Sequence, residues 1–94
     1  MDLKLKDMVV LITGGTNGLG LRTARLFAEE GCNISTCSLD DENVIKKVEE
    51  ELRSKGVQAL AQRANVCVPE EPEKVVNDTV KVFDGIDILI NNVG

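Results

Sequence analysis

The fold of this chain is decided by the stretch Val9-Val10-Leu11-Ile12-Thr13-Gly14-Gly15-Thr16-Asn17-Gly18-Leu19-Gly20. Its four leading apolar residues, three of them β-branched, predict a strand that is buried on both faces of a sheet. Four glycines follow within seven positions and lead into an apolar run that favours a helix. The first backbone N–H groups of such a helix have no partner inside it, and the helix dipole adds positive potential there. The stretch therefore predicts an anion site that holds phosphate without lysine or arginine.

The glycine spacing narrows the kind of phosphate site. Gly14, Gly18 and Gly20 give Gly-x-x-x-Gly-x-Gly, which differs from the tighter Gly-x-Gly-x-x-Gly of the common dinucleotide fingerprint. No Gly-Lys-Ser/Thr sequence follows, so the pattern disfavours the P-loop of nucleoside triphosphatases. Taken alone, the motif is equally compatible with a plain strand–turn–helix corner in which the glycines only permit the bend.

Composition bounds the class of protein. The 94 residues make at most one small domain, and 43% apolar and 29% charged residues are typical of a soluble globular protein. The sequence has no apolar run of membrane-spanning length and no basic-then-apolar leader, so we expect a cytoplasmic protein without a membrane partner. Sixteen acidic residues outnumber eleven scattered basic ones, and the only aromatic residues are Phe27 and Phe83. This balance disfavours nucleic acid as a partner.

The cysteines and the missing histidines disfavour a metal centre. Cys32, Cys37 and Cys67 are odd in number and show no Cys-x-x-Cys spacing, and the sequence contains no histidine. Buried thiols in a reducing compartment are therefore expected in preference to a disulfide or a zinc site.

Hydrophobic periodicity predicts an alternation of strands and helices, βαβαβαβ. The expected strands are residues 8–13, 33–38, 57–64 and 86–90. The first expected helix runs from about 18 to 30, and the second starts within residues 40–42 and is closed by Gly56. The third has Pro72 in its first turn and extends to Phe83. Strands that alternate with helices indicate a parallel sheet with right-handed crossovers. In such a sheet a ligand binds beyond the carboxyl ends of the strands, and the most informative residues follow those ends.

Spacings of three and four predict the buried faces of the helices. The expected inner-face residues are Leu19, Thr23, Ala24, Leu26 and Phe27 in the first helix, Val44, Ile45, Val48 and Leu52 in the second, and Val76, Thr79, Val80 and Phe83 in the third. The second helix should also carry three stabilising i,i+4 ion pairs on a solvated face. These expected pairs are Glu42–Lys46, Glu49–Arg53 and Glu51–Lys55.

Two motifs resemble those of one family. Thr13-Gly14-Gly15-Thr16-Asn17-Gly18-Leu19-Gly20 resembles the Thr-Gly-x-x-x-Gly-x-Gly loop of the short-chain dehydrogenases/reductases. Asn91-Asn92-Val93-Gly94 resembles the family's Asn-Asn-Ala-Gly motif at the expected separation. The resemblance implies an α/β fold with a Rossmann-like parallel sheet in strand order 3-2-1-4. Residues 1–94 would then form the N-terminal part of a single NAD(P)-binding domain.

The resemblance implies a role for each residue of the glycine loop. Gly14, Gly18 and Gly20 would form the floor under the pyrophosphate, and Leu19 would present its amide to a phosphate. The other loop residues are Gly15, Thr16 and Asn17, and the last two would lie beside the adenosine ribose.

The resemblance places further cofactor contacts after the other strands. Asn65 stands where the family usually has an aspartate that reaches the adenine amino group, and Val66 would pack on the ring. The Asn91 backbone would meet the ribose on the nicotinamide side. Val93, in place of the usual alanine, and Gly94 would line the adjacent wall.

The choice between NAD and NADP stays open at this point. An acidic residue just after the second strand bonds the ribose 2′-hydroxyl, whereas a basic one pairs with a 2′-phosphate. Ser38 and Leu39 occupy these two positions and supply neither charge, and Asn17 replaces a base that is common in NADP-preferring members. Asp40 would disfavour a phosphate if its loop turns inward.

The sequence lacks the chemistry that the resemblance implies. Family members transfer hydride between a nicotinamide and a carbonyl or alcohol, with a tyrosine as acid/base and a nearby lysine and serine. This chain contains no tyrosine, so we expect it to be inactive alone and to form the cofactor-binding part of a longer enzyme, which the family resemblance predicts to be a homo-oligomer. A non-catalytic dinucleotide-binding or regulatory module is the alternative. A small α/β protein without a ligand is the third possibility.

Overall fold

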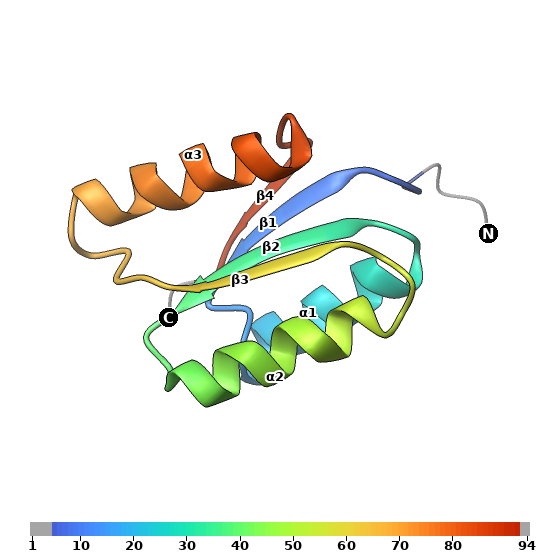
Figure 1. Cartoon of the computed structure of the whole chain (residues 1–94), viewed down its shortest axis with the longest axis horizontal. Coiled ribbons are helices and arrows are strands. Elements are labelled where there is room, and N and C mark those ends of the chain that lie inside the picture. The colour runs from blue at the N-terminus through green and yellow to red at the C-terminus, as the bar shows by residue number, and fades with distance from the viewer. Residues whose placement is uncertain (1–4, 93–94) are drawn as a thin grey trace.

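The computed structural model describes residues 5–92 and contains a four-stranded sheet in the order β3-β2-β1-β4. All three strand pairs are parallel, and Figure 1 shows the sheet between its helices. The elements are β1 (Val9–Thr13), α1 (Gly18–Glu29), β2 (Asn33–Ser38), α2 (Glu42–Arg53), β3 (Ala59–Arg63), α3 (Glu70–Phe83) and β4 (Ile88–Asn91). The predicted alternation and the predicted strand order are confirmed.

The sheet separates two apolar layers. Helices α1 and α2 cover one face and α3 covers the other (Figure 1). The first core cluster includes Val10 and Ile12 of β1, Ile34 of β2 and Ala24 of α1. The second, smaller cluster lies under α3 and includes Leu11 and Val75. Since β1 sends buried side chains to both faces, it is the doubly buried strand that its sequence predicts.

Some element boundaries differ from the sequence-based expectation. Strand β3 is shorter than residues 57–64, and β4 begins at Ile88 and not at residue 86. Helix α3 begins at Glu70, so Pro72 lies in its first turn, as predicted. The predicted ends of α1 and α2 are confirmed, because Gly31 and Gly56 follow these helices with φ angles of +90° and +89°. A positive φ is the conformation that favours glycine after a helix.

The predicted inner face of α1 is partly wrong. Leu19 and Leu26 are 68% and 64% exposed, whereas the buried positions are Gly20, Ala24 and Ala28. The helix lies so close to the sheet and the glycine loop that only small residues fit between them. A Cβ added at Gly20 would stand 2.1 Å from the carbonyl oxygen of Gly14.

The predicted faces of α3 and α2 need similar corrections. In α3, Val76 and Val80 are exposed, and Val75 is buried in their place, whereas the prediction of Thr79 is confirmed. Thr79 is accommodated because its hydroxyl donates to the Val75 carbonyl at 2.7 Å and shares a 2.7 Å hydrogen bond with Ser35 of β2. In α2, Val44 is exposed. The buried residues of α2 are Ile45, Val48 and Leu52.

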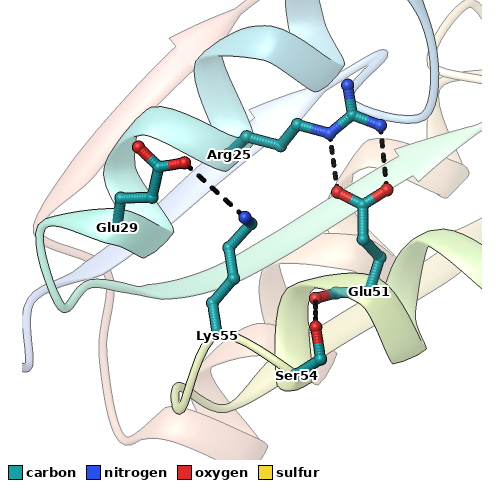
Figure 2. A network of polar contacts seen from close by, with 5 residues as sticks. All are labelled: Arg25, Glu29, Glu51, Ser54 and Lys55. Carbon is teal, nitrogen blue, oxygen red and sulfur yellow. Dashed lines mark hydrogen bonds and ion pairs between the residues drawn. The ribbon is translucent and has the colours of Figure 1, made fainter.

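Helices α1 and α2 are joined by ion pairs that the periodicity of α2 alone did not predict (Figure 2). The Glu51 carboxylate accepts from Arg25 Nε at 2.6 Å and from Arg25 Nη2 at 2.8 Å. Lys55 Nζ lies 3.6 Å from Glu29 Oε1. The predicted pair Glu51–Lys55 is therefore replaced by pairs to α1.

Of the other two predicted pairs, Glu49–Arg53 forms at 3.2 Å. Within residues 5–92, Glu42–Lys46 is not among the ion pairs. None of the helices in this part of the chain is long and apolar enough to cross a membrane.

Candidate functional site: the carboxyl edge of the sheet

The N-terminus of α1 opens at the carboxyl end of β1 and is not capped by a side chain. Asn17 is the N-cap residue, but its side chain makes no capping hydrogen bond. The Leu21 N–H donates to the Asn17 carbonyl at 3.1 Å, so the N–H groups of Gly18, Leu19 and Gly20 precede the first intrahelical bond. The first turn of α1 contains no acidic residue. Among residues 5–92, this helix end therefore keeps free donors, and its positive potential favours an anion.

The N-termini of α2 and α3, in contrast, carry acidic residues. In α2 the Asp41 side chain caps the helix by accepting from the Asn43 N–H at 2.8 Å, and Glu42 lies in the first turn. In α3 the first turn holds three glutamates. These carboxylates already complement the positive ends of their helices.

The three motif glycines play different structural roles. Gly18 has a φ of +54°. Apart from its chain neighbours and the backbone of its own helix, no atom of residues 5–92 lies within 4 Å of the place that a Cβ would occupy, so Gly18 faces open space there. Gly14, with a φ of +68°, and Gly20 pack against each other and against Asn92. The structure thus leaves the approach to Gly18 clear, while Gly14 and Gly20 permit the close contact of turn and helix. That all three form a floor under a pyrophosphate stays a prediction.

The ends of β1 and β4 are joined by side-chain hydrogen bonds. The Thr13 hydroxyl donates to Asn91 Oδ1 at 3.0 Å and accepts from the Asn92 N–H at 2.9 Å. Asn92 Nδ2 donates to the Gly14 carbonyl at 3.3 Å. The two sequence motifs, 78 positions apart, therefore meet at one edge of the sheet.

The glycine loop is supported from below by Thr36 of β2. The Thr36 hydroxyl is fully buried, donates to the Ile12 carbonyl at 2.6 Å and accepts from the Gly15 N–H at 2.9 Å. A Cβ on Gly15 would lie 2.2 Å from the same hydroxyl oxygen. The hydrogen bond and the close contact between Thr36 and Gly15 therefore fix the distance between the glycine loop and the sheet.

A second cluster links the glycine loop to the loop after β2. The Thr16 hydroxyl hydrogen-bonds to Ser38 Oγ at 2.8 Å and to Asp40 Oδ2, and Asn17 Nδ2 donates to Asp40 Oδ2 at 2.9 Å. The Asp40 N–H donates to Ser38 Oγ at 3.0 Å. The hydrogen bonds from Thr16 and then from Asn17 lower the pKa of the Asp40 carboxyl, so this group is ionised at neutral pH.

A cavity of about 230 Å³ adjoins this cluster at the ends of β2 and β3. It is lined by Gly14, Cys37, Ser38, Leu39, Ala64, Asn65, Val66, Cys67 and Asn92. Five of the predicted site residues therefore share one cavity. Asn65 Oδ1 accepts from the Cys67 N–H at 2.9 Å, which leaves one of its two lone pairs for a ligand.

The structure brings most of the predicted site residues to one edge. Ser38 and Asn91 are the last residues of β2 and β4. The other described site residues follow the ends of β1, β2 and β3, and these are Gly14 to Gly20, Leu39, Asn65 and Val66. Val93 and Gly94 lie outside the described residues. Sequence reasoning gave no role to Thr13, Thr36 or Asn92. Thr13 and Asn92 stand inside the two motifs, which is a usable signal, whereas nothing in the sequence around Thr36 marks it.

The comparison with protein families agrees with this geometry. The family model described as short chain dehydrogenase matches residues 8–94. The chain belongs to the short-chain dehydrogenase family.

Curated relatives of this short-chain dehydrogenase family chain include an uncharacterized oxidoreductase, YxnA, of Bacillus subtilis. It is 35% identical over 89 residues, which are 95% of this chain and 25% of that protein. The 3-oxoacyl-[acyl-carrier-protein] reductase FabG of Staphylococcus epidermidis is 34% identical over 84 residues, which are 89% of this chain and 34% of that protein. The chain thus spans between a quarter and about a third of these relatives.

Solved structures of other reductases show a similar fold. The L-sorbose reductase of Gluconobacter frateurii, complexed with NADPH and L-sorbose, has a TM-score of 0.94 and is 35% identical. Its match covers 100% of this chain and 36% of the reductase. The NADH-dependent reductase A1-R′ complexed with NAD has a TM-score of 0.89 and is 36% identical, with 100% of this chain and 39% of that one covered.

Proposed function

We propose that this chain is the N-terminal, cofactor-binding part of the single NAD(P)-binding domain of a short-chain NAD(P)-dependent oxidoreductase. In the complete protein, a bound nicotinamide would exchange hydride with a carbonyl or alcohol carbon of a small molecule. The proposal also includes a cytoplasmic location and a homo-oligomeric complete protein. The uncapped, acid-free N-terminus of α1 at the carboxyl edge of the sheet is the observation that carries the proposal.

The residues present fit the phosphates of a dinucleotide. The open space at Gly18 admits a group that a Cβ would exclude, and the N–H groups of Gly18, Leu19 and Gly20 supply donors. The cavity between Leu39 and Val66 offers an apolar slot for a base. The role of these residues is to bind and orient the cofactor.

The chain does not supply the proton-transfer group of the reaction. It contains no tyrosine and no histidine, and we propose that the acid/base comes from polypeptide that is not part of this sequence. A non-catalytic dinucleotide-binding module remains the second candidate, because the missing tyrosine suits it equally. The DNA downstream of codon 94 separates the two, since an open frame with serine and Tyr-x-x-x-Lys supports the enzyme and a stop codon supports the module.

The first experiment titrates the purified chain with NADH and with NADPH and follows nicotinamide fluorescence. We expect a saturable change with at least one of them. Gly18→Val should weaken that binding by roughly tenfold or more, because the new side chain fills the space through which a phosphate approaches the helix end.

Gly56→Val is the matched control. Gly56 also has a positive φ, +89°, and open space around it, but it lies in the α2–β3 connection away from the site. Both variants carry similar backbone strain, so only the loss of binding should differ. An unchanged affinity in Gly18→Val, or no saturable change with either nucleotide in the natural sequence, would contradict the proposal.

A further inference from the structure

We propose that Asp40 makes this site select NAD(H) over NADP(H), although the chain has no acidic residue at the end of β2 itself. The inference rests on the proposed function. It adds which of the two dinucleotides the site accepts and names the residue that decides. The sequence alone left this choice open, because Ser38 and Leu39 supply no charge.

The first step is the position of the ribose. The phosphates are assigned to the N-terminus of α1, and the adenine is assigned to the cavity lined by Leu39, Asn65 and Val66. The ribose that joins the two must lie between them. The ribose would therefore lie beside a hydrogen-bonded cluster that joins the glycine loop to the loop lining the cavity. This cluster consists of Thr16, Asn17, Ser38 and Asp40.

The second step is the state of the Asp40 carboxylate. The β2–α2 loop turns inward, and Oδ2 is held in place by Thr16 Oγ1 and Asn17 Nδ2. Within residues 5–92, Oδ1 accepts no hydrogen bond. The carboxylate is thus fixed with one oxygen free, and that oxygen can accept a hydrogen bond from a ribose hydroxyl.

The third step is electrostatic. A phosphate monoester such as the 2′-phosphate of NADPH carries a charge of about −1.5 to −2 at neutral pH. An ionised carboxylate at the same place repels it and offers it no donor, whereas a 2′-hydroxyl has a proton to donate. Asn17 already uses its side-chain amide on Asp40. The cavity lining includes no lysine or arginine among the described residues.

Arg63 is the basic residue that lies opposite Ser38 in the sheet. Its side chain is exposed at the β2–β3 edge of the site, so a 2′-phosphate would find its positively charged partner in Arg63. The ion pairs within residues 5–92 do not join Arg63 to Asp40. Asp40 therefore keeps its negative charge uncompensated by this arginine.

The test measures the dissociation constants of NADH and NADPH on the same chain, in the natural sequence and in three variants. In the natural sequence we expect NADH to bind roughly tenfold more tightly or better. Asp40→Asn should shrink that ratio to a few-fold, mainly by tightening NADPH binding, because it removes the charge and retains a hydrogen-bonding side chain.

Two variants serve as controls. Asp78→Asn removes the same charge from α3, where the carboxylate pairs with Lys74 at 2.9 Å, and should leave the nucleotide ratio unchanged. Arg63→Ala tests whether Arg63 instead makes the site prefer NADPH. Circular dichroism of each variant confirms that it is folded, and the ratio in the natural sequence is informative without any variant.

The outcomes separate this inference from the proposed function. Equal binding of the two nucleotides, a preference for NADPH that is lost in Arg63→Ala, or a ratio that Asp40→Asn leaves unchanged would overturn the selection by Asp40 while cofactor binding stands. Binding of neither nucleotide would overturn the proposed function, and the inference with it.

Discussion

At the scale of single residues, the position of the glycine loop depends on one buried hydroxyl. Thr36 bridges the Ile12 carbonyl at the end of β1 and the Gly15 N–H of the loop. Both of these backbone groups lie where water cannot replace the hydroxyl, because Gly15 and Thr36 are buried. The loop that is assigned to the phosphates is therefore held by a side chain from the neighbouring strand.

Thr36→Val tests this support. The change keeps the shape and leaves the Gly15 N–H without a partner, so we expect a loss of about 1–3 kcal/mol in the free energy of unfolding. The affinity for the dinucleotide should also fall, because the glycine loop is no longer held at a fixed distance from the sheet. Urea denaturation and nucleotide titration measure the two effects.

Thr36→Ser is the matched control, because it keeps the hydroxyl and removes only the methyl group. It should retain most of the nucleotide affinity. A Thr36→Val chain that is as stable and binds as tightly as the natural one would show that the hydrogen bond to Gly15 does not hold the loop.

Sequence reasoning works unevenly at this scale. The glycines could be assigned because a positive φ and a close approach demand a specific residue type, as at Gly14 and Gly20. Thr36 could not, because threonine is common in strands and its partners are backbone atoms of distant residues. Asp40 was a conditional prediction, and its outcome depended on the path of a loop that spacing does not determine.

At the scale of elements, helices α1 and α2 are held side by side by charge as well as by apolar contacts. The Arg25 guanidinium forms two hydrogen bonds to Glu51 and lowers the pKa of that carboxyl (Figure 2). Because the folded pKa is depressed, this pair stabilises the fold above the pKa of an unfolded glutamate. The contribution is lost as the pH falls through the folded value.

Glu51→Gln should therefore lower the free energy of unfolding near neutral pH. Its deficit relative to the natural chain should shrink as the pH falls below the ordinary glutamate pKa of about 4.3. Thermal unfolding at a series of pH values measures this.

Glu50→Gln is the control, because Glu50 is exposed on the same helix and forms no ion pair within the described residues. It should show a smaller deficit near neutral pH and little change of that deficit with pH. A Glu51→Gln deficit that does not depend on pH would mean that the ion pair does not contribute to stability.

Helix faces were predicted less well than helix positions, and the reason is geometric. Successive residues of a helix differ by about 100° in direction, so an error of one residue moves the predicted stripe to a flank. In α3 the prediction of Thr79 is confirmed, but Val75 faces the sheet in place of Val76 and Val80. In α1 the prediction of Ala24 is confirmed, but Leu19 and Leu26 are exposed, and the close approach of the helix to the glycine loop requires the small residue Gly20.

At the scale of the whole molecule, the alternation of strands and helices predicted a parallel sheet with right-handed crossovers. The order of the strands in that sheet came from the resemblance to the short-chain dehydrogenases/reductases, and the structure confirms it. The structure has β4 beside β1, and the Asn91-Asn92 pair consequently reaches Thr13 and Gly14. The ion pairs between α1 and α2 could not be predicted in this way, because they depend on the distance between two packed helices.

The most direct test of the central claim is a backbone amide NMR titration of the isotopically labelled chain with NADH. The claim is that the dinucleotide phosphates bind the free N–H groups at the N-terminus of α1. The amide signals of Gly18, Leu19 and Gly20 should shift in a saturable manner, while those of Glu42 and Asn43 at the capped N-terminus of α2 should stay in place. Saturable binding that leaves the Gly18–Gly20 amides unshifted would contradict the account.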